Sequence, residues 1–163
     1  MPKFFITMVD FIESYDCTID GKGRVIVPIS LKRQLKLFAD KKFVLKRGVY
    51  PDTPYLELYV MDEWNKQRMK LNKLNPYVKK NKDFIRAFFA GVKEVEMDAT
   101  GRILVAKDLL AYSGISKDVI MASVGNIIEI WDKASYEEKI AATGLNIGEL
   151  AEEVMGDIDF SQD

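Results

Sequence analysis

The chain makes the same tight turn twice, and no other feature constrains its fold as strongly. The segment DGKGRVIVP occupies residues 20–28, and DATGRILVA occupies residues 98–106. The spacing between them also aligns Leu31 with Leu109. A unit of a few short strands buries too little apolar surface to be stable alone. We therefore expect two copies of one unit to pack face to face through a pseudo-twofold axis and to share one core.

Both copies predict the same order of elements. Alternating apolar residues precede each turn, at Tyr15, Cys17 and Ile19 in the first copy, and predict a half-buried strand. A β-branched strand and a short helix follow each turn, and the helix of the second copy is expected to end at Gly114. A strand pair and a closing helix complete each copy. Three pairs of residues match in that last part: Glu57 with Glu129, Tyr59 with Trp131, and Trp64 with Tyr136.

The pattern divides the chain into four segments of an α+β protein. They are a first unit at 11–60, a helical connection at 61–91, a second unit at 92–138 and an acidic tail at 139–163. In the connection we expect two helices, the first capped by Asp62 and ended by Asn75–Pro76, and the second closed by Gly91. Residues 148–163 contain no Lys or Arg and few aromatic residues, so we expect them to be mobile or weakly docked.

The residue types that are missing exclude much chemistry. The chain has one cysteine and no histidine, which excludes an intramolecular disulfide, a Cys/His zinc site and any catalytic triad built on histidine. The DGKGR segment also lacks the spacing of a phosphate-binding loop. We expect no catalytic residue, no metal and no cofactor, and therefore a protein that is not an enzyme.

No segment of the sequence predicts export or a membrane span. The apolar run FFITMV stops at Asp10 and lacks the basic leader and the cleavage site of a signal peptide. Later apolar runs are shorter than the roughly 18 residues that cross a bilayer. We expect a cytoplasmic protein.

The net charge of -1 hides an uneven distribution of charge. Between residues 20 and 50 the only acidic residues are Asp20 and Asp40. The basic residues of that segment are Lys22, Arg24, Lys32, Arg33, Lys36, Lys41, Lys42, Lys46 and Arg47. The chain after residue 134 is instead rich in Glu and Asp. This distribution predicts a basic face and an acidic end.

Each turn brings together an aspartate, a glycine and an arginine, namely Asp20, Gly23 and Arg24 in the first copy and Asp98, Gly101 and Arg102 in the second. An aspartate at the head of a turn accepts backbone N–H bonds, glycine permits positive φ, and the arginine can reach back to the carboxylate. On that interpretation all these residues are scaffolding. A guanidinium at a loop edge equally suits phosphate or guanine recognition, so both roles remain open for the arginines.

Four segments of the sequence resemble the MraZ family of bacterial transcriptional regulators, which carry two AbrB-like units. They are FIESYDCTIDGKGRVIVP, RAFFAG, VEMDATGRILV and VGNIIEIW, and the resemblance covers about residues 11–138. The resemblance implies a double AbrB-like swapped-hairpin β-barrel formed by the two internal repeats, with a helical hairpin between them and helices after them. It also implies a ring-shaped homo-oligomer, and we expect an octamer.

The resemblance further implies sequence-specific binding to double-stranded DNA with repeated upstream elements. The protein would repress the division and cell-wall gene cluster that contains its own gene, and would be associated with the nucleoid. The family's D-x-x-x-R motif falls on Asp20, Arg24, Asp98 and Arg102. The sequence departs from the family at Glu13, where glycine is usual, and at Ala106, where proline is usual.

The expected DNA-binding residues combine this motif with neighbouring basic side chains: Lys22, Arg24, Lys32, Arg33, Arg102 and Lys107. The expected motif scaffold consists of Asp20, Gly23, Asp98 and Gly101. Because the first turn and the helix after it carry more basic residues than their counterparts, we expect the first unit to contribute more to DNA binding.

Two other classes of function remain open. The doubled unit could serve as a structural module that oligomerises or docks a protein, or as an antitoxin-like partner protein, since AbrB-like folds also occur in antitoxins. Binding to DNA that weakens steeply with salt would favour the regulator. Co-purification with a small toxin would favour the antitoxin.

Overall fold

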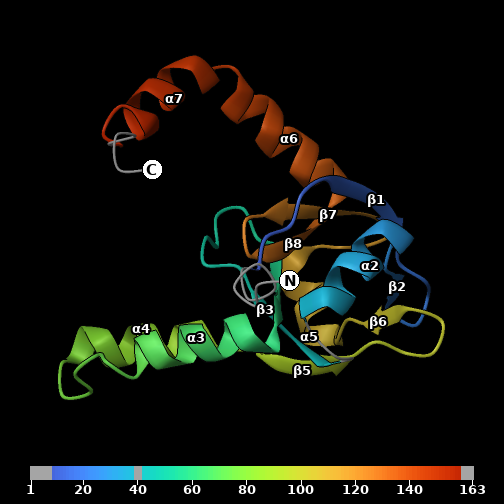
Figure 1. Ribbon diagram of the computed structural model, residues 1–163, viewed down its shortest axis with the longest axis horizontal. Helices are drawn as coiled ribbons and strands as arrows, with labels where there is room; N and C mark the ends of the chain where they lie inside the picture. Colours follow the sequence, from blue (N-terminus) through green and yellow to red (C-terminus); the bar gives the residue numbers. More distant parts are fainter. Residues whose placement is uncertain (1–8, 39–41, 159–163) are drawn as a thin grey trace, which may run out of the picture.

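The computed structural model describes residues 9–38 and 42–158, which form antiparallel sheets and helices (Figure 1). The strands in this part of the chain are β1 (Ser14–Thr18), β2 (Arg24–Ile26), β3 (Lys42–Arg47), β4 (Leu56–Val60), β5 (Lys93–Glu96), β6 (Arg102–Leu104), β7 (Asp118–Val124) and β8 (Ile127–Asp132). The helices are α2 (Ile29–Phe38), α3 (Met61–Leu71), α4 (Lys79–Phe89), α5 (Lys107–Ser113), α6 (Lys133–Gly144) and α7 (Ile147–Met155).

The two copies have the same order of elements. The first copy runs β1, β2, α2, β3, β4, α3, and the second runs β5, β6, α5, β7, β8, α6. The helix α5 ends at Gly114, whose φ of 70° is in the left-handed region and whose N–H donates to the carbonyl of Leu110. The structure therefore confirms the α+β class, the internal repeat and the predicted end of this helix.

Strands of the two copies are interleaved, so neither copy forms a complete sheet alone. In the described residues, one sheet has the order β1-β7-β8-β4-β3-β5 and a second sheet consists of β2 and β6. Strand β1 of the first copy pairs with β7 of the second, and β5 of the second pairs with β3 of the first. Equivalent strands of the two copies also pair directly, β2 with β6 and β4 with β8. This interleaving explains why one short chain contains the unit twice.

The core between the two sheets is built from equivalent positions of both copies. Val25 and Ile103 face each other across the β2–β6 pair, and both are fully buried. Leu31 and Leu109, which the repeat aligns, are also fully buried on α2 and α5. Burying one such aliphatic side chain contributes about 1.5–3 kcal/mol, so both copies must supply these residues for the core to be stable.

The helices α3 and α4 form the expected hairpin, which extends to one side of the sheets (Figure 1). Its base is held by aromatic packing, since the ring of Trp64 lies 5.9 Å from that of Phe88 and 5.6 Å from that of Phe89. Gly91, with a φ of 76°, follows α4 as expected. The predicted N-cap at Asp62 is wrong, because α3 already begins at Met61 and has no side-chain cap. The helix also ends before Asn75–Pro76.

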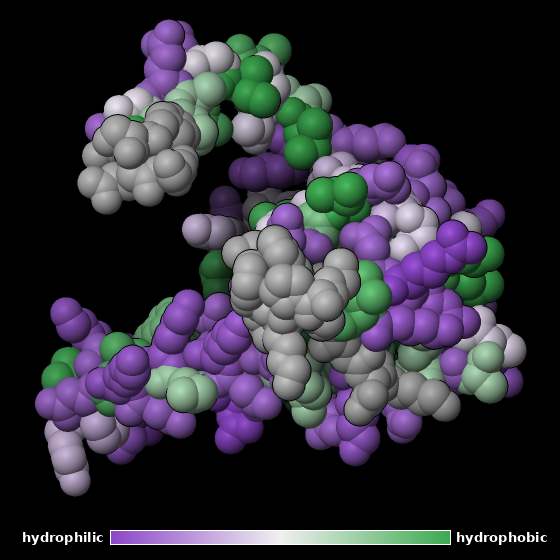
Figure 2. Space-filling view, in the orientation of Figure 1, coloured by the Kyte–Doolittle hydropathy of each residue, from purple (hydrophilic) through white to green (hydrophobic). Residues whose placement is uncertain are grey.

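The C-terminal segment is more regular than its composition predicts. Helix α6 continues to Gly144, and α7 follows at Ile147–Met155 with none of its residues buried. The two helices form an arm that extends away from the sheets, and Figure 2 shows hydrophobic residues along it. Ile147, Leu150 and Val154 have amphipathic helical spacing, and because no residue of α7 is buried, the expectation that residues 148–163 are mobile or weakly docked stays a prediction. Residues 159–163 of the predicted tail lie outside the described residues.

The length and hydropathy of the described helices differ from those of membrane spans. None of those between residues 9 and 158 is long and apolar enough to cross a bilayer.

Candidate functional site

The first turn holds its aspartate and its arginine together through several hydrogen bonds. Asp20 Oδ1 accepts from the backbone N–H groups of Lys22 at 2.9 Å and Arg24 at 3.0 Å. The Nε of Arg24 donates to the other carboxylate oxygen at 2.7 Å. Gly23, with a φ of 83°, allows the chain to reverse between them. The turn thus has the hydrogen bonds that its residue types predict.

The second turn repeats this geometry. Asp98 Oδ1 accepts from the backbone N–H of Thr100 at 3.0 Å and of Arg102 at 2.9 Å, and from the hydroxyl of Thr100 at 2.9 Å. The Nε of Arg102 donates to Asp98 Oδ2 at 2.8 Å, and Gly101 has a φ of 80°. The hydroxyl bond has no counterpart in the first turn, where Lys22 occupies the equivalent position.

Hydrogen bonds lower the pKa of both aspartates below its ordinary value. The backbone N–H of Arg24, together with its guanidinium, lowers the pKa of Asp20. The backbone N–H of Arg102 is the main cause that lowers the pKa of Asp98 to about 2. Each arginine therefore has a permanent anionic partner at its Nε, which fixes the plane of the guanidinium.

The two turns lie side by side because their strands pair. The N–H of Val27 donates to the carbonyl of Gly101 at 2.9 Å, and that of Val105 donates to Gly23 at 2.8 Å. The β2–β6 register places Arg24 opposite Leu104 and Ile26 opposite Arg102. Since strand residues alternate between faces, all four of these side chains point away from the buried Val25–Ile103 pair. We call this outward surface, formed by Arg24, Ile26, Arg102 and Leu104, the turn face.

The terminal nitrogens of the two arginines are available to a ligand. The side chains of Arg24 and Arg102 are 30% and 29% exposed. Within the described residues, their hydrogen bonds and ion pairs to carboxylates use Nε only. A guanidinium held in this way presents its η N–H groups in a fixed direction. That arrangement suits a planar acceptor pair such as a carboxylate, a phosphate or the edge of guanine.

Lys32 of α2 reaches the second turn, although in sequence it follows the first. A Cβ atom built on Gly101 would lie 3.2 Å from Lys32 Nζ. The corresponding neighbour of Gly23 is Leu110 of α5, at 3.4 Å. Each helix therefore covers the turn of the other copy, because β2 and β6 pair across the pseudo-twofold axis. The expectation that Lys32 adds charge to the first turn does not match this position.

The other predicted binding residues are exposed around the turn face. Lys22 is exposed within the first turn, Arg33 on α2 and Lys107 at the start of α5. Beside Lys107, the carboxylate of Asp108 forms an ion pair with Lys93 at 3.5 Å. The structure brings Lys32, Arg24 and Arg102 toward the paired turns and shows no direct contact that joins Arg33 or Lys107 to them.

Comparison with known proteins identifies the family. The family described as "MraZ protein, putative antitoxin-like" matches residues 11–86 and 88–154. The chain belongs to the MraZ family. Both turns lie within these matched segments, as do most residues of the arm, so the match to MraZ covers the repeat and the helices around it.

Individual MraZ proteins are similar to the chain over most of its length. A protein of Christiangramia forsetii named transcriptional regulator MraZ is 48% identical over 94% of this chain and 97% of its own length. One of the same name from Flavobacterium psychrophilum is 48% identical over 93% of this chain and 95% of its own. A third, from Caldanaerobacter subterraneus subsp. tengcongensis, is 40% identical over 85% and 92%.

The apolar part of the turn face is absent from the set of site residues predicted above. Ile26 is 58% exposed and Leu104 is 55% exposed, and each lies opposite an arginine. The signal was present in the sequence, because each short strand carries a large aliphatic residue at an outward position, where such a residue is unusual unless something covers it.

Proposed function

We propose that this protein is a transcriptional regulator that binds double-stranded DNA through the turn face. The observation that carries the proposal is the pair of aspartate-held arginines on adjacent strands, pointing in one direction. Membership of the MraZ family, whose similar members are named transcriptional regulators, supports the same conclusion. The function is not that of an enzyme.

Each part of the turn face suits one part of a DNA groove. The η N–H groups of Arg24 and Arg102 match the O6 and N7 acceptors of guanine, which a guanidinium binds bidentately. Lys22 and Lys32 lie beside the two turns, where phosphate contacts would set affinity and register. The exposed methyl groups of Ile26 and Leu104 would meet the apolar edge of the bases.

Assembly would multiply the weak contacts of one turn face. We propose a ring-shaped homo-oligomer, an octamer, built from protomers whose interleaved sheets close as a swapped-hairpin barrel. The exposed apolar side chains of α7 support such an assembly, because an unpartnered apolar stripe on a helix is a typical contact surface. Several turn faces on spaced DNA repeats would gain about 10²- to 10⁴-fold in avidity.

The proposed target is the upstream region of the division and cell-wall gene cluster that contains the protein's own gene. There the protein would act as a repressor, as a cytoplasmic protein associated with the nucleoid. A footprint on that region would test both the site and the repeat spacing, which should match the distance between turn faces.

The direct test is DNA binding by matched arginine variants. Fluorescence anisotropy would measure the affinity of the parent, Arg24→Ala, Arg102→Ala and Arg86→Ala for the labelled upstream region. Arg86 is the control because it also pairs with an aspartate, Asp83, but lies on the hairpin. Loss of a bidentate base contact costs about 1–3 kcal/mol, so we expect roughly 10- to 100-fold weaker binding for the first two variants. Parent-like binding by both would refute the proposal.

A protein-docking or assembly module is the second candidate, favoured by the exposed apolar surface of the arm. It predicts that truncation of α7 changes assembly while no arginine variant affects DNA binding. An antitoxin-like role predicts a co-purifying toxin. The anisotropy experiment separates the regulator from both, because only the regulator requires Arg24 and Arg102.

A further inference from the structure

One row of side chains across the large sheet shows how the two copies differ. The register pairs Lys46 with Glu57, Glu57 with Glu129, and Glu129 with Ala122. The pseudo-twofold axis passes between the two glutamates, so Lys46 and Ala122 are equivalent positions. The row therefore contains two neighbouring carboxylates, a lysine beside the first and a methyl group beside the second.

The first copy contains a complete binding site for an ammonium group. Lys46 is 1% exposed, and its Nζ lies 3.3 Å from Glu57 Oε1. The same ammonium lies 4.3 Å from the centre of the Phe88 ring, in a cation–π contact. Tyr59 donates its hydroxyl to Glu57 Oε1 at 3.2 Å and holds the carboxylate in place.

The second copy has the same frame without the cation. Trp131 Nε1 donates to Glu129 Oε1 at 3.0 Å, as the hydroxyl of Tyr59 does to Glu57. Tyr136 packs edge-on against Trp131 at 5.8 Å, as Trp64 packs against Tyr59 at 5.4 Å.

No cationic side chain in the described residues forms an ion pair with Glu129. Nine ion pairs occur among the described residues, and Glu129 takes part in none of them. Burial raises the pKa of Glu129, and the charge of Glu57 adds to the rise.

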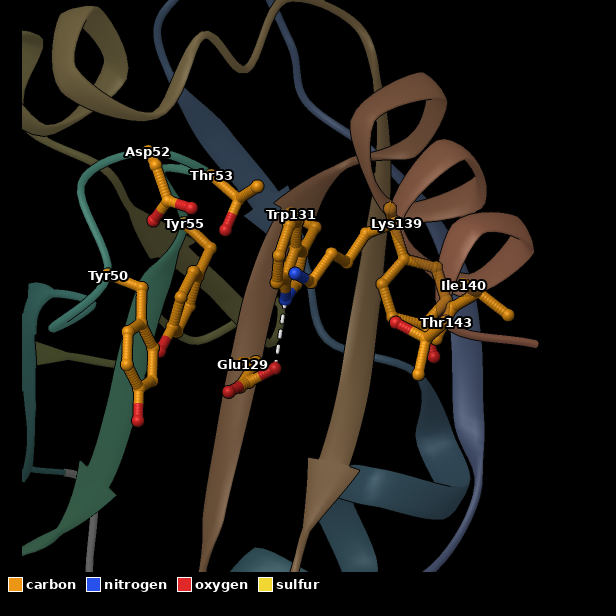
Figure 3. A pocket seen from close by; sticks show the side chains of 10 residues that line it. Tyr50, Asp52, Thr53, Tyr55, Glu129, Trp131, Lys139, Ile140 and Thr143 are labelled. Atoms are coloured by element: carbon orange, nitrogen blue, oxygen red, sulfur yellow. Dashed lines mark hydrogen bonds between the residues drawn. The ribbon is translucent and has the colours of Figure 1, made fainter. Parts of the chain in front are cut away.

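A cavity of about 350 Å³ opens beside Glu129. Figure 3 shows it between the loop that carries Tyr50 and Tyr55, the strand that carries Trp131, and the helix that carries Lys139. The rings of Tyr55 and Trp131 stack at 4.6 Å with an angle of 6° between their planes. The volume lies within the usual range of about 300–1,000 Å³ for ligand pockets.

The two copies differ in the helix that follows the closing helix. In the first copy α4 folds back beside α3, and Phe88 covers the ammonium of Lys46. In the second copy α6 leads into α7, which continues along the arm and does not return to the sheet (Figure 1). Glu129 and the rings of Tyr55 and Trp131 therefore line a cavity that α6 borders, and the side chain of Lys139 extends toward Trp131 without forming an ion pair with Glu129 (Figure 3).

We propose that the cavity at Glu129 binds a primary alkylammonium group, from a free amine or from a lysine of a second copy of this chain. The first copy shows the chemistry, because there a carboxylate and an aromatic frame hold the ammonium of Lys46. The carboxylate of Glu129 would accept a charge-assisted hydrogen bond, and the rings of Tyr55 and Trp131 would contact the alkyl chain.

Butylammonium chloride, which carries the end of a lysine side chain, is the probe. The protein has two tryptophans, so ¹⁵N-tryptophan labelling gives two indole N–H signals. The Trp131 signal reports the hydrogen bond to Glu129, and the Trp64 signal is the internal control. At constant ionic strength we expect the Trp131 signal to shift with a dissociation constant on the order of 1 mM, and Trp64 to stay unchanged. Butanol, which lacks the charge, should bind at least about tenfold more weakly.

Two variants keep the test falsifiable. Glu129→Gln preserves an acceptor for Trp131 but removes the charge, and it should weaken butylammonium binding by at least about tenfold. Ala122→Lys installs the missing lysine and should abolish binding if the variant remains folded. Equal binding of butylammonium by Glu129→Gln and the parent, or equal shifts with butanol, would overturn the proposal. Binding only by Lys139→Ala would also overturn it, because Lys139 would then be the occupant.

Sedimentation velocity distinguishes the two sources of the ammonium group. If a lysine of a second copy occupies the cavity, saturating butylammonium should lower the mass of the assembly, and Ala122→Lys should do the same. If the ligand is a free amine, the assembly should keep its mass while the Trp131 signal shifts. Either result supports the alkylammonium site, whereas no shift of Trp131 at 20 times the expected constant, on the order of 20 mM, refutes it.

Discussion

The two copies agree in the core between the two sheets and differ on the opposite face of the large sheet. The inward positions match closely, with Val25 equivalent to Ile103 and Leu31 to Leu109, because both copies fill one shared core. The row on the opposite face of the large sheet does not match, since the buried Lys46 of the first copy is equivalent to the buried Ala122 of the second. A shared core constrains its residues twice, once from each copy, whereas the opposite face is constrained by only one copy and is free to acquire a separate role.

The turns show the same contrast at a finer scale. The hydrogen-bonded frames of Asp20 and Asp98 are nearly identical. The side chains around them differ, because Lys22 belongs to the first turn while Lys32 lies against the second. The positive charge is therefore shared between the turns more evenly than the order of residues along the chain predicts.

The largest expected difference concerns the buried ion pair. Lys46→Ala would leave Glu57 buried without its cation, which typically costs 3–5 kcal/mol, so we expect the free energy of unfolding to fall by about that amount. Glu129→Gln in the second copy should cause no such loss at neutral pH. The pKa of Glu129 is raised in the folded protein, so its ionised form costs stability above that pKa, and glutamine removes the cost.

Urea denaturation of the two variants at one protein concentration would measure both effects. Comparable losses for Lys46→Ala and Glu129→Gln would contradict the comparison, since they would show that Glu129 has a stabilising partner as strong as Lys46. A parent-like stability of Lys46→Ala would show that Glu57 is neutral in the folded protein.

The next effect concerns the salt dependence of DNA binding. For duplex DNA, log K falls with log salt by about 0.9 per neutralised phosphate. Lys22→Ala and Lys32→Ala should each flatten this slope by about one for every turn face engaged, because each lysine lies beside one turn. Lys107→Ala should flatten it less, as Lys107 lies next to the carboxylate of Asp108 along the chain.

Salt titrations of binding to the upstream DNA would give the three slopes. If Lys22→Ala changed the slope strongly and Lys32→Ala left it unchanged, the first turn would contribute more to DNA binding, as the sequence predicts. If all three variants kept the slope of the parent, the DNA would bind a face other than the turn face.

The smallest effects come from restoring residues that one copy has and the other lacks. Glu13 has a φ of 78°, and the repeat aligns it with Gly91, whose φ is 76°. Glu13→Gly should relieve the strain of a side chain in the left-handed region, with a gain of about 1 kcal/mol. Ala106, with a φ of -62°, aligns with Pro28, and Ala106→Pro should gain about 0.4–1 kcal/mol.

Thermal unfolding with far-ultraviolet circular dichroism would detect both gains as higher midpoints. A loss of stability in Glu13→Gly would mean that the side chain of Glu13 makes an unseen favourable contact. A lower midpoint for Ala106→Pro would mean that the backbone N–H of Ala106 donates a hydrogen bond that stabilises the protein.

The sequence was informative wherever both copies had to satisfy one geometry. The repeat, the hydrogen bonds of the turns and the end of α5 at Gly114 follow from residue types whose local preferences are strong. The shared core also follows, because a unit too small to fold alone must pack against its partner, but the residues predicted face-to-face packing, and only the family resemblance implied exchanged strands. Glu57 and Glu129, matched in the sequence, indeed lie directly opposite each other in the β4–β8 ladder.

Other features depend on tertiary contacts that local patterns do not encode. The position of Lys32 beside Gly101 requires the crossing of β2 and β6, which moves a helix away from the turn it follows in sequence. Helices after the second unit were expected from the resemblance, but the acidic composition of residues 148–163 does not specify the position of α7. The Glu129 cavity depends on the direction of the arm, and no short motif in the sequence specifies that direction.

The most direct test of the DNA-binding account is Arg24→Lys, which keeps the charge and changes the shape. A lysine cannot hold Asp20 through one nitrogen and present two parallel N–H groups to a base. Anisotropy with the upstream DNA and with a scrambled sequence would separate specific from general affinity. We predict roughly 10- to 100-fold weaker binding to the upstream DNA, with affinity for the scrambled DNA unchanged. Parent-like specificity in Arg24→Lys would contradict the claim that an aspartate-held guanidinium reads the bases.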